Sequence, residues 1–147
     1  MLIPALVAAV ALPLAAAPAA LARPTIKSVA FKGTIVRPTV VITGSGFGSR
    51  PSRKPLTGCK AKGDVGSDYG TNLWLEVTPP GGGTWGAGRS KGRAADCIGL
   101  VAVSWSNTRI SYRLGKYYLV SGVDFPRGSD YRVGVKGATK TGKVKYS

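Results

Sequence analysis

The chain has 147 residues, of which 21 are Lys or Arg and 6 are Asp or Glu, so its formal net charge is +15 at pH 7. It contains two cysteines and no histidine. The chain therefore has few of the residues needed for Ser-His-Asp catalysis, for hydrolysis by paired carboxylates or for a zinc site. We therefore expect a protein that is not an enzyme and holds no cofactor or metal, and its basic charge favours anionic partners.

The first 22 residues contain no charged side chain and consist almost entirely of Ala, Leu, Val and Pro. They end in Ala-Leu-Ala at 20–22, the small-residue spacing of a signal-peptide cleavage site. We interpret residues 1–22 as a signal peptide and residues 23–147 as one secreted or cell-surface domain with no membrane span after processing. The alternative is a membrane anchor, which about 20 apolar residues could form, but Pro13 and Pro18 argue against it.

The first two predicted strands lie on either side of Gly33. In Pro24–Phe31 polar and apolar residues alternate loosely, and Val29 and Phe31 would share one face. Pro38–Gly48 begins with β-branched residues that suit a buried strand and ends in a glycine-rich turn, into which Phe47 could fold as a plug. A phosphate-binding loop would need a helix after these glycines, and a basic, proline-rich stretch follows instead.

The middle of the chain predicts one strand between two loops. Ser49–Asp64 has no usable periodicity and is expected to be a loop or an irregular edge. Thr71–Val77 places Leu73, Leu75 and Val77 on one face, with Trp74 on the other. Pro79–Arg93 contains six glycines and three basic residues, which predicts a mobile surface loop.

The last third of the chain predicts five further strands. Their ranges are Cys97–Trp105, Thr108–Leu114, Tyr117–Val120, Asp130–Lys136 and Lys143–Tyr146. About seven to eight short strands without an amphipathic helix predict an all-β fold, either a β-sandwich or a small barrel.

Cys59 and Cys97 are the two cysteines of a chain that we expect to be exported. An even cysteine count in an oxidising compartment predicts a disulfide bond between them. A reactive thiol or half of a metal site is the alternative, but other metal ligands are scarce.

Two stretches of the sequence resemble a known family. Thr43–Gly48, with the sequence TGSGFG, follows the opening strand, and Trp105–Ile110, with the sequence WSNTRI, precedes the last strands. Both are similar to motifs of the IPT/TIG domains, in the same order along the chain. The resemblance covers the start and the C-terminal third of the mature chain. It implies an immunoglobulin-like β-sandwich that serves as an interaction or spacer module, with no catalytic residue to carry over.

Basic residues alternate with inward-facing residues on three of the predicted strands. If the last two strands pair, four of these cations should share one sheet face, and two more form a row on the strand Thr108–Leu114. The first four are Arg132, Lys136, Lys143 and Lys145, and the other two are Arg109 and Arg113. The simpler interpretation is that such charges solvate the sheet and discourage edge-to-edge aggregation.

Trp74 and Trp85 are the aromatic candidates for ligand binding. Trp74 lies on the polar side of its predicted strand and Trp85 lies in the glycine-rich loop, so either could stack on a sugar ring. Packing against the domain surface is the simpler role for both. Together these features predict a module that binds an anionic polymer or a glycan. The alternative is a structural module that packs against a partner protein of the cell envelope.

Overall fold

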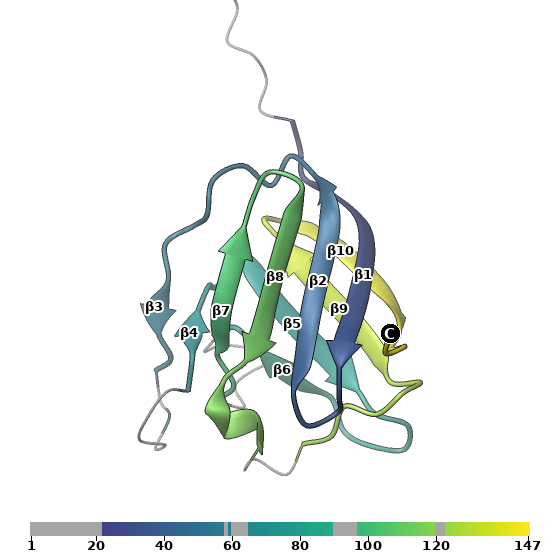
Figure 1. Ribbon diagram of the computed structural model, residues 1–147. Helices are drawn as coiled ribbons and strands as arrows, with labels where there is room; N and C mark the ends of the chain where they lie inside the picture. Colours follow the sequence, from purple (N-terminus) through teal and green to yellow (C-terminus); the bar gives the residue numbers. More distant parts are fainter. Residues whose placement is uncertain (1–21, 58, 60–64, 90–96, 120–122) are drawn as a thin grey trace, which may run out of the picture.

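The computed structural model describes residues 22–57, 59, 65–89, 97–119 and 123–147. The predicted signal peptide lies outside these residues, apart from Ala22. Within the described ranges the chain forms ten strands and one 3-10 helix, and the strands make two antiparallel sheets that pack face to face (Figure 1). The prediction of an all-β sandwich is confirmed. No helix in the described part is long and apolar enough to cross a bilayer.

Six strands form the larger sheet, in the order β1-β2-β8-β7-β4-β3. Their bounds are Thr25–Gly33 for β1, Pro38–Ser45 for β2, Arg109–Leu114 for β8, Leu100–Trp105 for β7, Ser67–Asp68 for β4 and Lys54–Pro55 for β3. The second sheet has the order β10-β9-β5-β6. Its strands are Ala138–Lys143, Asp130–Val135, Leu73–Thr78 and Trp85–Ala87, and the helix η1 is Lys116–Leu119.

The core between the sheets follows from the alternation in the sequence. Val40 and Ile42 of β2 face Leu73 and Leu75 of β5 across one continuous cluster, and all four are fully buried. Aromatic rings from both layers close one end of this cluster, where Phe31 makes edge contacts with Phe125, Tyr131 and Tyr146. The opposite side of each strand points to the outer face of its sheet.

The two stretches that resemble IPT/TIG motifs contact each other at the glycine-rich turn after β2. Phe47 is fully buried, as the sequence predicts, and its backbone N–H donates to the carbonyl of Asn107 at 3.1 Å. The N–H of Gly48 donates to Oδ1 of Asn107, and its carbonyl accepts from Nε1 of Trp105 at 3.0 Å. Residues about 60 positions apart in the chain are thereby held together at one end of the sandwich.

Three predicted elements are wrong. Tyr117–Val120 is not a strand, because the N–H of Tyr118 donates to the carbonyl of Gly115 and starts the helix η1. The glycine-rich loop contains β6, which pairs with β5 and is buried. The last strand begins at Ala138, well before the predicted Lys143.

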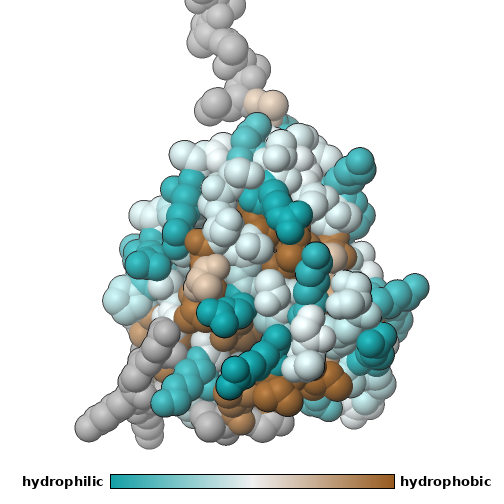
Figure 2. Space-filling model, viewed as in Figure 1, coloured by the Kyte–Doolittle hydropathy of each residue, from teal (hydrophilic) through white to brown (hydrophobic). Residues whose placement is uncertain are grey.

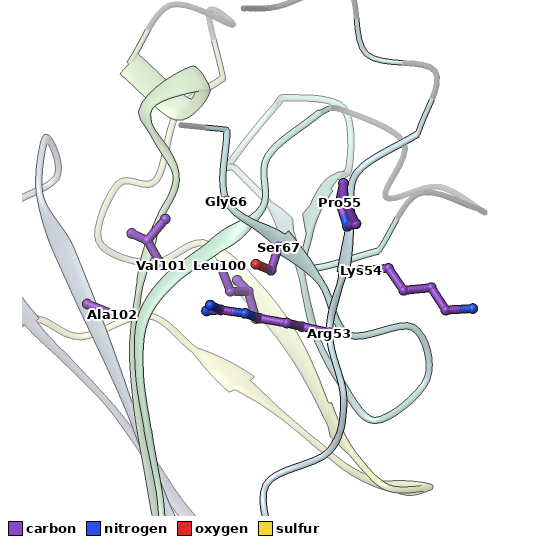
Figure 3. A pocket seen from close by; sticks show the side chains of 8 residues that line it. All are labelled: Arg53, Lys54, Pro55, Gly66, Ser67, Leu100, Val101 and Ala102. Carbon is purple, nitrogen blue, oxygen red and sulfur yellow. The ribbon is translucent and has the colours of Figure 1, made fainter. Parts of the chain in front are cut away.

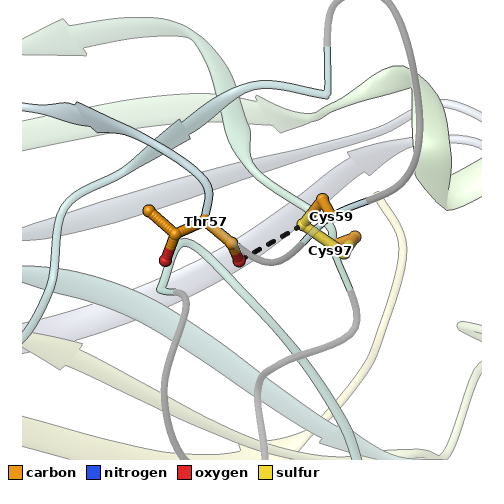
Figure 4. The surroundings of a disulfide bond; sticks show 3 residues. All are labelled: Thr57, Cys59 and Cys97. Atoms are coloured by element: carbon orange, nitrogen blue, oxygen red, sulfur yellow. Dashed lines mark hydrogen bonds between the residues drawn. A yellow bond between two sulfur atoms is a disulfide. The ribbon is translucent and has the colours of Figure 1, made fainter.

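The predicted disulfide is confirmed. Cys59 and Cys97 are bonded with their Cα atoms 5.5 Å apart (Figure 4). The bond ties the segment after β3 to the segment that enters β7, where Ile98 makes an isolated bridge with Ala87 of β6. The disulfide therefore fastens the short strands at this edge of the sandwich to its long strands.

Candidate functional site

The four cations near the C-terminus do not form one row. β9 and β10 pair as a hairpin, and their register places Thr141 opposite Arg132 and Lys143 opposite Asp130. Arg132 and Lys143 are therefore exposed on the outer face of the hairpin. The prediction of a shared face is wrong for Lys136, because this residue belongs to the turn between β9 and β10 and not to a strand.

Lys136 lies away from that face, and Lys145 is exposed just beyond the end of β10. Lys136 occupies the two-residue turn between β9 and β10, with a φ of 46°, and its Nζ donates to the carbonyl of Ser49 at 2.8 Å. Its ammonium group also lies 5.4 Å from the centre of the Trp105 ring. Lys145 follows the end of β10, in the segment where Tyr146 bridges Phe31.

Carboxylates compensate the charge on the outer face of the smaller sheet. Lys143 pairs with Asp130 at 2.8 Å. Glu76 lies opposite Arg132 in the register of β5 and β9 and forms an ion pair with Arg89. This face therefore presents charges of both signs in close alternation, and an incoming anion would meet two carboxylates as well as the cations.

Trp74 lies on this outer face, as the sequence predicts, but it is buried there. The indole packs across Gly134, where a Cβ atom would come within 2.2 Å of the ring. The guanidinium carbons of Arg89 and Arg132 lie 4.3 Å and 5.3 Å from the ring centre. Cation–π contacts already cover the indole, so it is not an open platform for a sugar.

Trp85 belongs to the core and not to an exposed loop. It is 3% exposed in β6, and its Nε1 donates to the carbonyl of Asp124 at 2.7 Å. Its ring packs against Tyr118 and Phe125, with centroid distances of 5.7 Å and 5.4 Å. The predicted placement of Trp85 in a surface loop is wrong, because its glycine-rich surroundings form a paired strand.

Arg109 and Arg113 are placed as predicted, exposed on the same side of β8 while Ile110 and Tyr112 point into the core. They are four positions apart in the strand, a distance of about 13 Å. The register across β2 places Arg113 beside Thr39 and Arg109 beside Thr43. Both arginines therefore extend from the middle of the outer face of the larger sheet.

Lys32 of β1 completes this arrangement. It is paired with Thr39, so Lys32, Thr39 and Arg113 form one row across three adjacent strands. We call Lys32, Arg109 and Arg113 the cationic face. The alternation of Val29 and Phe31 implied an outward residue at position 32, but the predicted strand ended at Phe31 and the lysine was missed.

The strands of the cationic face are free of acidic residues, and their outer side carries hydroxyl groups together with Ala30 and Val41. No Asp or Glu occurs in β1, β2, β7 or β8, and the carboxylate in the sheet is Asp68 of β4, which is paired in register with Lys54. Hydroxyl groups lie between the cations, and Ser28 and Thr43 share a hydrogen bond of 2.5 Å. Figure 2 shows hydrophilic side chains dispersed among neutral and apolar ones on this side of the molecule.

A hollow of about 440 Å³ adjoins the same sheet at the edge of β7. Val101 in its lining is the register partner of Arg113. Arg53 extends across the hollow toward Leu100, whereas Lys54 points away from it (Figure 3). Arg53 lies in the stretch predicted as a loop, where no periodicity indicated which basic residues would reach the sheet.

The described residues contain no group of three or more His, Cys, Asp or Glu side chains that could hold a metal ion. Among these residues, Lys32, Arg109 and Arg113 extend from strands that contain no Asp or Glu. Comparisons of the chain with protein-family models, with curated proteins and with solved structures find no match.

Proposed function

We propose that residues 23–147 form a secreted or cell-surface, immunoglobulin-like module of the IPT/TIG type that binds an anionic polymer or an acidic glycan. The ligand lies along the cationic face of the larger sheet. The module performs no catalysis and needs no cofactor. The disulfide supports an exported protein, because such bonds persist in oxidising compartments.

A single observation carries the assignment to this sheet. Lys32, Arg109 and Arg113 project from adjacent strands that contain no carboxylate, whereas the cations of the smaller sheet face Glu76 and Asp130. A polyanion on the cationic face releases counterions and meets no like charge there. The hydroxyl groups between the cations can donate hydrogen bonds to sulfate, phosphate or carboxylate oxygens.

Binding to dextran sulfate, with neutral dextran as the reference ligand, tests this function. The variant Lys32→Gln/Arg109→Gln/Arg113→Gln should bind about tenfold or more weakly at low salt, because three phosphate-like contacts are lost. The matched control Arg132→Gln/Lys143→Gln/Lys145→Gln removes the same charge elsewhere and should stay within about twofold of the wild type. Both variants should keep their melting temperature, since exposed charges contribute little to stability.

The dependence on salt separates the outcomes. Wild-type affinity should fall steeply with ionic strength, and the cationic-face variant should lose most of that slope. An equal loss in both triple variants would show that total charge, and not this face, attracts the polymer. If the wild type does not bind dextran sulfate at low salt, a structural module that packs against an envelope protein becomes the better assignment.

A further inference from the structure

One end of the sandwich carries all the large apolar side chains that are exposed in the described part of the chain. These are Ile35, Val36 and Leu119, with exposed fractions of 41%, 59% and 53%. We call these three residues the apolar tip. Ile35 and Val36 belong to the turn between β1 and β2, and Leu119 ends η1, two elements that lie at the lower end of Figure 1.

The turn presents its apolar residues in an ordered way. The N–H of Arg37 donates to the carbonyl of Thr34 at 3.1 Å, so Ile35 and Val36 occupy the two central positions of a β-turn. Small polar residues, Gly and Pro dominate such positions. The hydroxyl of Tyr118 donates to the carbonyl of Ile35 at 2.6 Å and fastens the turn to η1. The apolar tip is therefore held in place by two hydrogen bonds.

Three cations lie beside the apolar tip. Val36 and Leu119 line a hollow of about 260 Å³ whose other lining residues include Arg37, Arg113 and Lys116. All three cations are exposed, and no carboxylate lines the hollow. The apolar tip and the three cations beside it form an amphipathic surface, and Figure 2 shows apolar and hydrophilic side chains adjacent at this lower end.

We propose that the apolar tip docks the module onto an anionic lipid bilayer. Ile35, Val36 and Leu119 would enter the boundary between headgroups and acyl chains, where apolar side chains of peripheral proteins insert. Arg37, Arg113 and Lys116 would lie at the level of the lipid phosphates, and basic residues near such a surface each add to the affinity. Their aliphatic stems can follow the apolar tip while their charges reach the phosphates.

The size and charge of the surface favour a bilayer over a protein. A stable protein interface needs about 800 Å² from each partner and a complementary shape, and three apolar side chains around a shallow hollow provide neither. Insertion into lipid needs no complementary partner surface. A second copy of the chain would bring the same cations against each other, which opposes self-association through this end.

Sedimentation with vesicles tests the proposal. The wild type should pellet with vesicles that contain phosphatidylglycerol and much less with vesicles of phosphatidylcholine alone. Val36→Ser/Leu119→Ser should lower the partition coefficient about tenfold or more, and Arg37→Gln/Lys116→Gln should lower it by a similar factor. The control Val36→Leu keeps an apolar side chain at the turn and should bind at least as well as the wild type.

The same variants separate this surface from the polymer-binding face. Val36→Ser/Leu119→Ser should keep its affinity for dextran sulfate, and Lys32→Gln/Arg109→Gln should lose that affinity while it still binds vesicles. Equal pelleting of the wild type and Val36→Ser/Leu119→Ser would overturn the insertion, because charge alone would then explain binding. Absence of vesicle binding, or self-association of the wild type that this variant abolishes, would also overturn it.

Discussion

At the scale of single residues, the surroundings of a side chain decide its role more than its position in the sequence. The sequence makes Trp74 and Trp85 candidates for ligand stacking, but both are buried. Trp74 lies beneath two guanidinium groups, and Trp85 lies in the core. Alternation places Trp74 on the outer face correctly. The alternation could not predict that Arg89, which lies outside the predicted strand, covers the indole of Trp74.

Gly134 is the partner that lets Trp74 lie flat against the sheet. Gly134→Ala should lower the free energy of unfolding by about 1 to 3 kcal/mol, because the new Cβ would lie 2.2 Å from the indole and force it outward. Urea unfolding measures the loss. Gly83→Ala, where no atom lies within 4 Å of the new Cβ, is the matched control and should change stability little. In a Trp74→Ala background the cost of Gly134→Ala should disappear, and a cost that persists would refute the steric explanation.

Tyr112 and Tyr146 are core tyrosines whose hydroxyl groups differ in their partners. The Tyr112 hydroxyl is buried without a hydrogen-bond partner among the described residues, whereas the Tyr146 hydroxyl donates to the carbonyl of Phe125 at 2.8 Å. Tyr112→Phe should therefore leave stability unchanged or raise it by up to about 1 kcal/mol. Tyr146→Phe should lower it by about 1 to 2 kcal/mol, because a buried carbonyl loses its donor. Thermal unfolding of the pair checks both signs, and a clear loss in Tyr112→Phe would mean that its hydroxyl has a partner.

At the scale of elements, long strands can be predicted from the sequence and short ones cannot. β1, β2, β5, β7, β8 and β9 each have six or more residues and show alternation or a continuous apolar run. β3, β4 and β6 have two or three residues, too few for a period, and pairing with neighbouring strands defines them. The start of β10 depends on the turn at Lys136 and Gly137, where both φ angles are positive and Gly137 adopts 90° without strain.

The candidate site was predictable to the extent that it lies on those long strands. Arg109 and Arg113 were placed correctly by the alternation of β8. Lys145 lies just beyond the end of β10, and the turn geometry of Lys136 could not be predicted from a period of two residues. The contrast between the two sheets depends on cross-strand neighbours such as Glu76 and Arg132, which only the register reveals.

The disulfide is the covalent link between the short and the long strands. Cys59→Ala/Cys97→Ala should lower the free energy of unfolding by about 3 to 4 kcal/mol, because the bond closes a loop with a sequence separation of 38. For a domain of this size that corresponds to a fall of about 10 °C or more in melting temperature. Calorimetry of the double variant, which leaves no free thiol, measures the effect. Reductant should reproduce it in the wild type, and an unchanged melting temperature in both experiments would contradict the stabilising role.

At the scale of the whole molecule, the distribution of charge matters more than its total. The net charge of +15 predicts anionic partners without locating them. The fold concentrates compensating carboxylates on the smaller sheet and leaves the cationic face without them. It also places the exposed apolar residues at one end, beside cations that line the same hollow. A polymer and a bilayer would then contact two adjoining surfaces of one small domain, which share Arg113.

The whole molecule should also lose stability at alkaline pH. Burial raises the pKa of Tyr112, Tyr131 and Tyr146 above the ordinary value, and burial together with the charge of Asp124 raises the pKa of Tyr118 to about 12. Because the folded pKa lies above the unfolded value of about 10, these groups contribute their stability fully below pH 10. That contribution declines as the pH rises toward 12, where the unfolded chain has released protons that the folded chain retains.

Two optical signals test this prediction. The melting temperature measured by circular dichroism should be nearly constant below about pH 10 and should fall above that pH. Lysines lose their charge in the same pH range, which relieves the repulsion of the net positive charge and opposes this fall. Absorbance at 295 nm should show that part of the tyrosine ionises only as the fold is lost. Tyr118→Phe removes one of these phenols. The melting temperature of this variant should fall less steeply with pH than that of the wild type, whatever its value at neutral pH. Complete ionisation near pH 10 with an intact circular dichroism spectrum would show that these phenols are not buried in solution.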